Sequence, residues 1–268
     1  MTTLFKVGAQ LFIGAILLFS ASSCSKTPGD VIKKDQAELN GRLERLDAIC
    51  AKAAAIQKLD SDKITLPAGA PAMGMNGICY RLDGCPSYYQ WEGNVQLFSL
   101  KELQDPLEAN HATSDMFAAR ELVWKPVKGM VKNGSFPKDK KEAIKALQAF
   151  CQWRYVVVLN IRAAQAPSAN PQPTGGFVTD TRSYQSGTFS CGFVEGDALL
   201  FDLDKAEFLG GFPITARNSE KIESVTYGND DPNKRMQYNL DMDLIKQIRK
   251  AIGDGIKKRV PAAMVARD

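Results

Sequence analysis

The sequence predicts an α+β fold, in which an antiparallel sheet of about four strands, within residues 153–215, is covered by helices from both ends of the chain. Three patterns predict this fold class. Apolar residues recur at helical spacing early in the chain, a β-branched run followed by a hairpin pattern lies in the second half, and an apolar stripe at helical spacing closes the chain. Strands that follow one another with short turns favour antiparallel pairing.

A helix is predicted over residues 31–59, because its apolar residues fall on one helical face. They are Leu39, Leu43, Leu46, Ile49, Ala53 and Ile56. We expect this helix to pack on the domain, and a coiled-coil stalk is the alternative.

Residues 60–98 are predicted to be irregular, and their aromatic side chains to pack over the core or, alternatively, to stack on a ligand. These aromatics are Tyr80, Tyr88, Tyr89 and Trp91. Helices are predicted again from Ser99, over 115–124 up to Pro126, and from Asp139.

The sheet is predicted to begin with a buried central strand over residues 154–161, since this run is apolar and rich in valine. A strand over 188–194 follows, and 198–203 with 207–214 form a hairpin that turns at 204–206. Gly210 and Gly211 indicate a bulge. Residues 224–227 are a further short strand, and the Pro/Gly-rich segment 167–176 is a loop.

The last predicted element is a C-terminal amphipathic helix, with Asp231 as its N-cap and Pro232 in its first position. Its apolar stripe consists of Met236, Leu240, Leu244, Ile248, Ile252 and Ile256. Its basic residues include Lys246, Arg249, Lys250, Lys257, Lys258 and Arg259. The stripe indicates packing on the core, and binding to an anionic membrane or an acidic partner is the alternative.

The composition is that of a folded, water-soluble domain. Apolar residues make up 44% of the chain and charged residues 24%, which excludes a disordered or many-pass membrane protein. The net charge, 34 − 30 = +4, argues against a nucleic-acid partner.

The first residues have the layout of an export signal. Lys6 precedes a mostly apolar run over 7–19, and small residues lead to Cys24. Ala21-Ser22-Ser23-Cys24 resembles the lipobox of bacterial lipoproteins, although Ala21 stands where leucine is usual. The resemblance implies a signal peptide over 1–23 and acyl chains such as palmitate on Cys24. Residues 24–30 would then be a lipidated tether, and 31–268 one domain.

The resemblance also implies a place in the cell. The protein would be attached to a membrane of the bacterial envelope, facing an aqueous compartment such as the periplasm. Ser25 after the cysteine favours the outer over the inner membrane. Two alternatives stay open: secretion after ordinary signal-peptidase cleavage, and an uncleaved anchor.

The remaining cysteines suggest disulfides, which persist in oxidising compartments. Cys79 and Cys85 enclose a short segment with an Asp-Gly turn, and Cys151 with Cys191 is a second candidate pair. Cys50 would then be free; the alternative is that some or all five are reduced core residues. Zinc is not expected, because the chain lacks CxxC and has a single histidine.

The candidates for catalysis are few. His111 is the only histidine, and it lies in an ordinary loop context. Asp202 and Asp204 flank one residue of a strand, so that both carboxylates would share one face and could bind a metal together or act as an acid/base pair. The favoured alternative is a solvated outer face beside the hairpin turn, where aspartate is common. No GxSxG, P-loop or GxGxxG motif is present, and no cofactor is expected.

The sequence therefore favours a membrane-anchored envelope lipoprotein with a non-catalytic binding or scaffolding domain and an unidentified envelope protein as partner. The alternatives are a hydrolase-like enzyme that uses Asp202 and Asp204, and a small-ligand-binding protein that uses the aromatics of 80–91 with the 167–176 loop.

Overall fold

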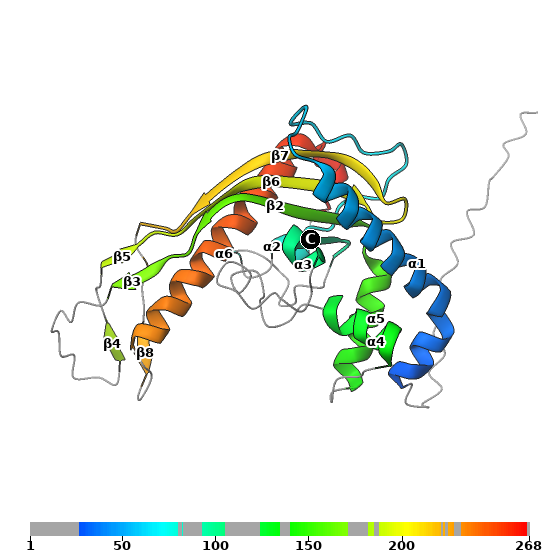
Figure 1. Cartoon of the computed structure of the whole chain (residues 1–268), viewed down its shortest axis with the longest axis horizontal. Helices are drawn as coiled ribbons and strands as arrows, with labels where there is room; N and C mark the ends of the chain where they lie inside the picture. The colour runs from blue at the N-terminus through cyan, green and yellow to red at the C-terminus, as the bar shows by residue number, and fades with distance from the viewer. Residues whose placement is uncertain are drawn as a thin grey trace, which may run out of the picture.

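A computed structural model describes residues 27–79, 82, 93–104, 124–134, 140–170, 182–184, 188–220, 222, 225–227 and 232–266. Figure 1 shows a curved sheet with long helices packed against it. This sheet has four strands. The strand order is β1 (Val95–Ser99), β2 (Tyr155–Gln165), β6 (Phe193–Asp202) and β7 (Glu207–Arg217). β1 is parallel to β2, and the other two pairs are antiparallel. The predicted α+β fold class is confirmed, with one parallel strand that the prediction lacked.

That parallel strand, β1, lies in the segment that was predicted to be irregular. Its residues pair with the first half of β2, from Val95 opposite Tyr155 to Ser99 opposite Leu159. Four of its five residues are buried. The sheet therefore draws one strand from the first half of the chain.

β2 is the central strand that its valine-rich sequence predicts, since it pairs with β1 on one side and β6 on the other. Val156 and Val158 face one hydrophobic core, and Tyr155, Val157 and Leu159 face the other. A strand buried on both faces has no polar face, which explains why apolar and polar residues do not alternate in this run.

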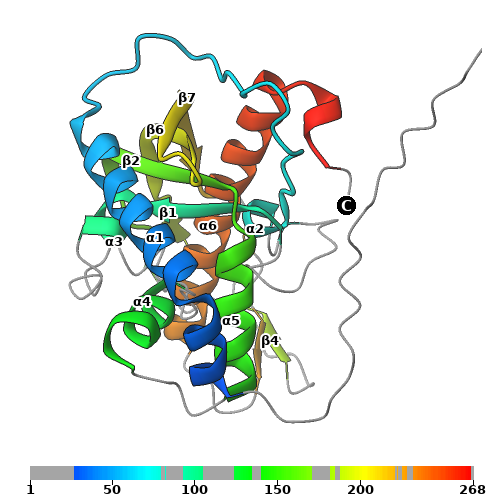
Figure 2. The same cartoon turned by 90° about the vertical axis from the view of Figure 1, so that its right-hand side faces the viewer.

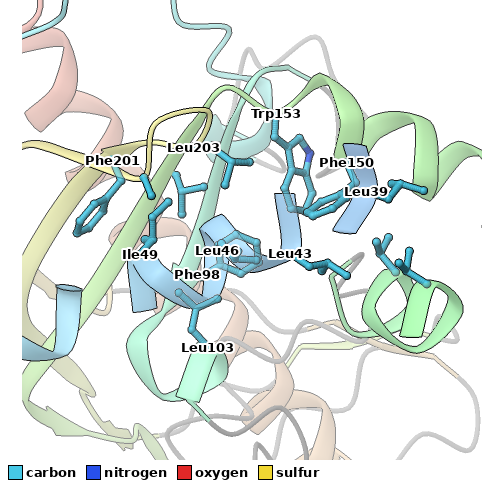
Figure 3. Packing of buried hydrophobic residues seen from close by; sticks show 14 of the residues in the cluster. Leu39, Leu43, Leu46, Ile49, Phe98, Leu103, Phe150, Trp153, Phe201 and Leu203 are labelled. Atoms are coloured by element: carbon cyan, nitrogen blue, oxygen red, sulfur yellow. The ribbon is translucent and has the colours of Figure 1, made fainter. Parts of the chain in front are cut away.

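The first core lies between the sheet and four helices: α1 (Pro28–Ala55), α3 (Leu100–Gln104), α4 (Trp124–Asn133) and α5 (Lys140–Gln152). Figure 3 shows the apolar face of α1 in this core, so α1 packs on the domain and is not a coiled-coil stalk. Trp153 meets the rings of Phe98 and Phe150 edge-on, at centroid distances of 5.6 and 5.0 Å.

α1 begins at Pro28, three residues before its predicted start at residue 31 and within the predicted tether. Thr27 is its N-cap: the Thr27 hydroxyl accepts from the Asp30 N–H at 3.3 Å, and the Thr27 N–H donates to the Asp30 carboxylate at 2.8 Å. The Thr27 N–H and the Thr27 hydroxyl both donate to the Asp30 carboxylate, and these two bonds lower the pKa of Asp30. This capping box and Pro28 in the first turn start the helix, so residues 28–30 are not a flexible tether.

α4 corrects a second boundary. Pro126 was predicted to end a helix, but it lies in the first turn of α4. Proline is tolerated there because N–H groups of a first turn have no partner within the helix. Residues 115–123 of the predicted helix lie outside the described residues.

α6 (Pro232–Arg259) and the short α2 (Asn76–Cys79) cover the second face of the sheet. All six residues of the predicted apolar stripe are buried, and Figure 2 shows α6 on the side of the sheet away from α1. Arg259 lies over the Phe212 ring, at 4.6 Å from its centroid. The stripe is therefore used inside the protein, and the alternative that it binds a membrane surface is wrong.

The remaining strands form two small pairs, β3 (Ser168–Asn170) with β5 (Thr188–Ser190), and β4 (Arg182–Tyr184) with β8 (Val225–Tyr227). The strand predicted over 188–194 is two strands, since β5 ends before Cys191 and β6 starts at Phe193. Asp231 and residues 171–176 lie outside the described residues.

The predicted bulge in β7 is present, as the register against β6 shifts between Leu200 and Phe201. Gly210 has a φ of +125° and pairs through an isolated bridge with Ile64. A side chain at Gly210 would overlap the backbone carbonyl of Lys63, so this close approach requires glycine. The β6–β7 hairpin is otherwise as predicted.

Two glycines near the end of α6 provide a test of this packing. Gly255 lies against the buried Phe212 ring, and a Cβ there would overlap ring atoms, whereas a Cβ at Gly253 would lie 3.9 Å from Ile78. Gly255→Ala should destabilise the fold by about 1–3 kcal/mol, because a packed ring cannot move freely. Gly253→Ala, the matched control, should stabilise it by about 0.5–1 kcal/mol through helix propensity. Urea unfolding followed by circular dichroism checks both; equal stabilisation by the two variants would contradict the packing.

Candidate functional site

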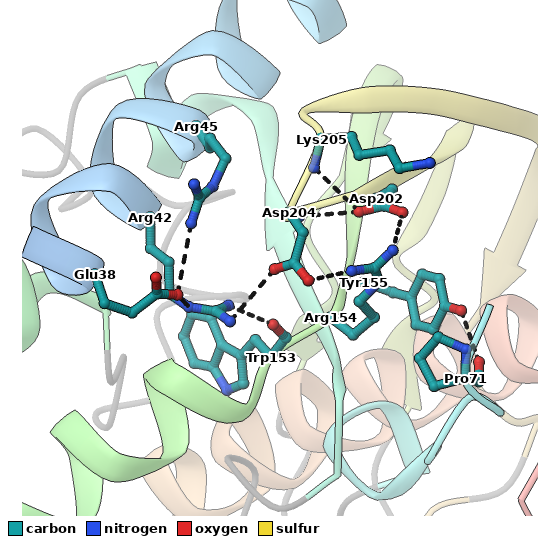
Figure 4. Close-up of polar contacts among 10 residues, drawn as sticks. All are labelled: Glu38, Arg42, Arg45, Pro71, Trp153, Arg154, Tyr155, Asp202, Asp204 and Lys205. Atoms are coloured by element: carbon teal, nitrogen blue, oxygen red, sulfur yellow. Dashed lines mark hydrogen bonds and ion pairs between the residues drawn. The ribbon is translucent and has the colours of Figure 1, made fainter. Parts of the chain in front are cut away.

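The two candidate carboxylates, Asp202 and Asp204, meet at one guanidinium (Figure 4). They do not share a strand face as predicted, because β6 ends at Asp202 and Asp204 lies in the turn that follows. The turn brings both to Arg154, which donates to Asp202 Oδ2 at 2.5 Å and also to Asp204. Arg154 precedes β2, whose first residue is paired with Asp202.

Asp202 is fully buried, and both of its carboxylate oxygens have partners. Oδ1 accepts from the backbone N–H of Asp204 at 2.9 Å and of Lys205 at 3.2 Å, while Oδ2 accepts from Arg154. An aspartate that accepts from N–H groups two and three residues later stabilises a turn. Asp202 thus shapes the β6–β7 turn and leaves no oxygen for a substrate.

The cluster extends to α1 through Arg42, which is almost fully buried. Arg42 donates to the carbonyl of Trp153 and to Glu38, both at 2.6 Å, and lies 3.3 Å from Asp204. Burial alone would lower the pKa of Arg154, but the carboxylates of Asp202 and Asp204 outweigh it and raise that pKa. The arrangement is an ion network that joins α1 to the hairpin turn.

This network predicts very different costs for its two aspartates. Asp202→Ala should destabilise the protein by about 3 kcal/mol, because it removes the buried partner of Arg154, which retains only Asp204, and leaves two turn N–H groups without their acceptor. Asp204→Ala should cost less than about 1 kcal/mol, since Asp204 is partly exposed to water. Asp202→Asn retains an oxygen for the turn and should fall between them. Urea titrations measure all three, and equal losses at both positions would contradict the assignment.

One of the two predicted disulfides is absent from the structure. Cys151 and Cys191 are both free, so the predicted bridge between them is wrong: Cys151 lies in the last turns of α5, and Cys191 is exposed between β5 and β6. Cys50 is free, as predicted. Cys79 is disulfide-bonded. Its predicted partner Cys85 lies outside the described residues, so that pairing stays a prediction.

The free thiols should differ in reactivity. Burial raises the pKa of both Cys50 and Cys151, so that each holds less thiolate at a given pH than an ordinary thiol. Iodoacetamide at about pH 8 should therefore alkylate exposed Cys191 about tenfold faster than either. Raising the pH should speed the two slow reactions, and urea should make the three rates alike. Peptide mass spectrometry gives the rates; Cys50 reacting as fast as Cys191 in the folded protein would contradict the prediction.

A hollow of about 520 Å³ lies where β1 ends and α3 begins. Ser99, Leu100, Lys101 and Gln104 line it on one side, and residues 159–164 of β2 on the other. Among the described residues that line it, two are cationic, Lys101 and Arg162, and none has a carboxylate. Sequence reasoning missed this place, because the hollow depends on where β1 stops beside β2.

Several predicted candidates lie outside the described residues: Cys24, Cys85, His111 and the aromatics of 80–91. Within the described part of the chain, no group of three or more His, Cys, Asp or Glu side chains is placed to hold a metal ion. No helix in that part is long and apolar enough to cross a membrane.

Comparisons with known proteins give no relative. No protein-family model matches the chain, and neither curated proteins nor solved structures include a significant match.

Proposed function

We propose that the chain is a lipid-anchored protein of the bacterial cell envelope, and that its folded domain binds a partner without catalysing a reaction. The observation that carries the proposal is the leader. Residues 1–23 have the layout of an export signal, and Cys24 follows them directly. Ala21-Ser22-Ser23-Cys24 resembles a lipobox.

The start of α1 supports a short link between anchor and domain. Thr27 caps the helix, so only residues 25–27 separate Cys24 from the first helical residue, Pro28. Multiple acyl chains on Cys24 would hold the protein firmly, since each buried methylene contributes about 0.8 kcal/mol. The domain would face an aqueous compartment of the envelope, with Ser25 favouring the outer membrane.

Two features of the domain support binding over catalysis. The candidate carboxylates Asp202 and Asp204 are engaged by Arg154, and Asp202 is fully buried. The hollow beside β2, in contrast, is open and lined by Lys101 and Arg162. A hollow whose described lining is cationic and holds no paired acid and base is suited to recognition.

Intact mass spectrometry of the full chain from its native membranes tests the anchor. The expected mass is that of residues 24–268 with acyl chains, and Cys24→Ala should abolish both the acyl mass and the cleavage after residue 23. Cys50→Ala is the matched control, because Cys50 lies within α1 and its loss should leave acylation unchanged.

Two results would overturn the anchored form. A chain that starts at Cys24 without acyl chains would show ordinary secretion, and a chain that retains residues 1–23 would show an uncleaved segment.

A further inference from the structure

β2 is longer than the neighbour that covers one of its edges. β1 pairs only with Tyr155–Leu159, whereas β2 continues to Gln165. On its other edge, β2 pairs with β6 along almost its whole length. Among the described residues, no strand pairs with the β1-side edge of residues 160–165.

The backbone direction at this edge follows from the paired half of β2. The Tyr155 N–H donates to Asn94 O at 2.8 Å, so Tyr155 directs its hydrogen-bonding groups toward β1. Alternate residues of a strand face the same neighbour, which makes Ile161 the first residue beyond β1 to face this side. A bulge between Ile161 and Ala163 shifts the alternation by one, so Ala164 is the next. Ile161 and Ala164 both pack against the α6-side core, as this shift requires.

The described part of the chain leaves room beside this unpaired edge, which we call the free edge. After Ser99 the chain leaves the line of β1 and forms α3, and the hollow of about 520 Å³ opens between α3 and β2. Ala163 and Ala164 line the hollow with small side chains, so a backbone can approach closely. Backbone groups at a strand edge bind another strand when one is offered.

Two cations set the chemistry of what can bind there. Arg162, which is half exposed, is held by Asp197 and lies 3.5 Å from the carbonyl of Gly196. Lys101 is exposed and has no ion-pair partner among the described residues. A bulge and a charged side chain are features that keep a free edge from pairing indiscriminately. An arriving strand that supplies a carboxylate would pair with Lys101, while Arg162, already paired with Asp197, adds positive charge nearby.

We propose that the edge over Asn160–Gln165 receives an extended segment of a partner protein, which adds to the sheet in line with β1 and places an acidic side chain near Lys101 and Arg162. The proposal rests on the partner-binding domain of the proposed function and names its surface. A second copy of the chain is disfavoured, because two such edges paired about a twofold axis would bring together Arg162 and Lys101 of both copies.

Peptide selection with the full acylated chain in detergent micelles tests this proposal. The probe is a pool of random peptides about ten residues long, enough to cover the edge, with glutamate fixed at the centre. A matched pool has lysine there. The glutamate pool should be enriched by at least about tenfold over the lysine pool. Bound peptides should slow hydrogen exchange at the amides of Ile161 and Ala164.

Two pairs of variants locate the binding. Ala164→Pro removes an N–H that faces the free edge, and should weaken binding by about tenfold or more, whereas Ala164→Gly retains the N–H and should bind normally. Lys101→Glu should reverse the preference between the pools, and Lys205→Glu, in the β6–β7 turn, should not. Lys101 is on the surface, so its variant remains informative if Ala164→Pro does not fold.

The outcomes separate this proposal from the proposed function. Peptides that bind without slowing exchange at Ile161, or that bind Lys101→Glu and the parent chain alike, would uphold a binding domain and overturn strand addition. Retention of no peptide, with Cys24 acylated, would overturn strand addition and leave the anchor standing. Strand addition would also be overturned if the amides of Ile161 and Ala164 were already protected from hydrogen exchange without peptide. If that protection grew with protein concentration, the occupant of the edge would be a second copy of the chain.

Discussion

The two-residue junction between α5 and β2 is the constraint on which the other layers depend. The N–H of Arg154 donates to Asn94 O ahead of β1, and its carbonyl accepts from Leu203 in the β6–β7 turn, both at 2.8 Å. The carbonyl of Trp153 accepts from Arg42 of α1. Since β1, α1 and the hairpin turn are all bonded here, the register of β2 is set at its first residue. Where β1 stops along β2 follows from this register.

Several helices and strands of this fold are predictable because the residues that each one buries follow a regular pattern within a short stretch of sequence. The valine run of β2 and the stripe of α6 show their burial within a single window of sequence. β1 does not, because its five residues gain their place only from pairing with Tyr155–Leu159, sixty residues later (95 against 155). The start of α1 was a different failure. Thr27 and Asp30 have the spacing of a capping box and Pro28 suits a first helical turn, so the sequence itself indicates a helix start within the segment that was predicted to be a tether.

The candidate site divides in the same way. Asp202 and Asp204 can be chosen from the sequence as neighbouring carboxylates, but their role depends on Arg154, which only the pairing of Tyr155 with Asp202 brings alongside. The free edge of β2 is even harder to predict from the sequence. Nothing in residues 160–165 signals that a neighbour is missing, because a free edge is defined by the length of the adjacent strand.

α1 connects the proposed anchor to the proposed binding edge, so its length limits the distance between the two. α1 has 28 residues, which at about 1.5 Å each gives a length of roughly 40 Å. The helix begins four residues after Cys24. Just beyond its other end, the carbonyl of Ile56 accepts a hydrogen bond from the side chain of Asn160, the first residue of the free edge. With Cys24 acylated, α1 would thus separate the edge from the lipid by up to its own length. A partner segment would then be met in the aqueous compartment, where its backbone must be extended and unpaired to add to the sheet.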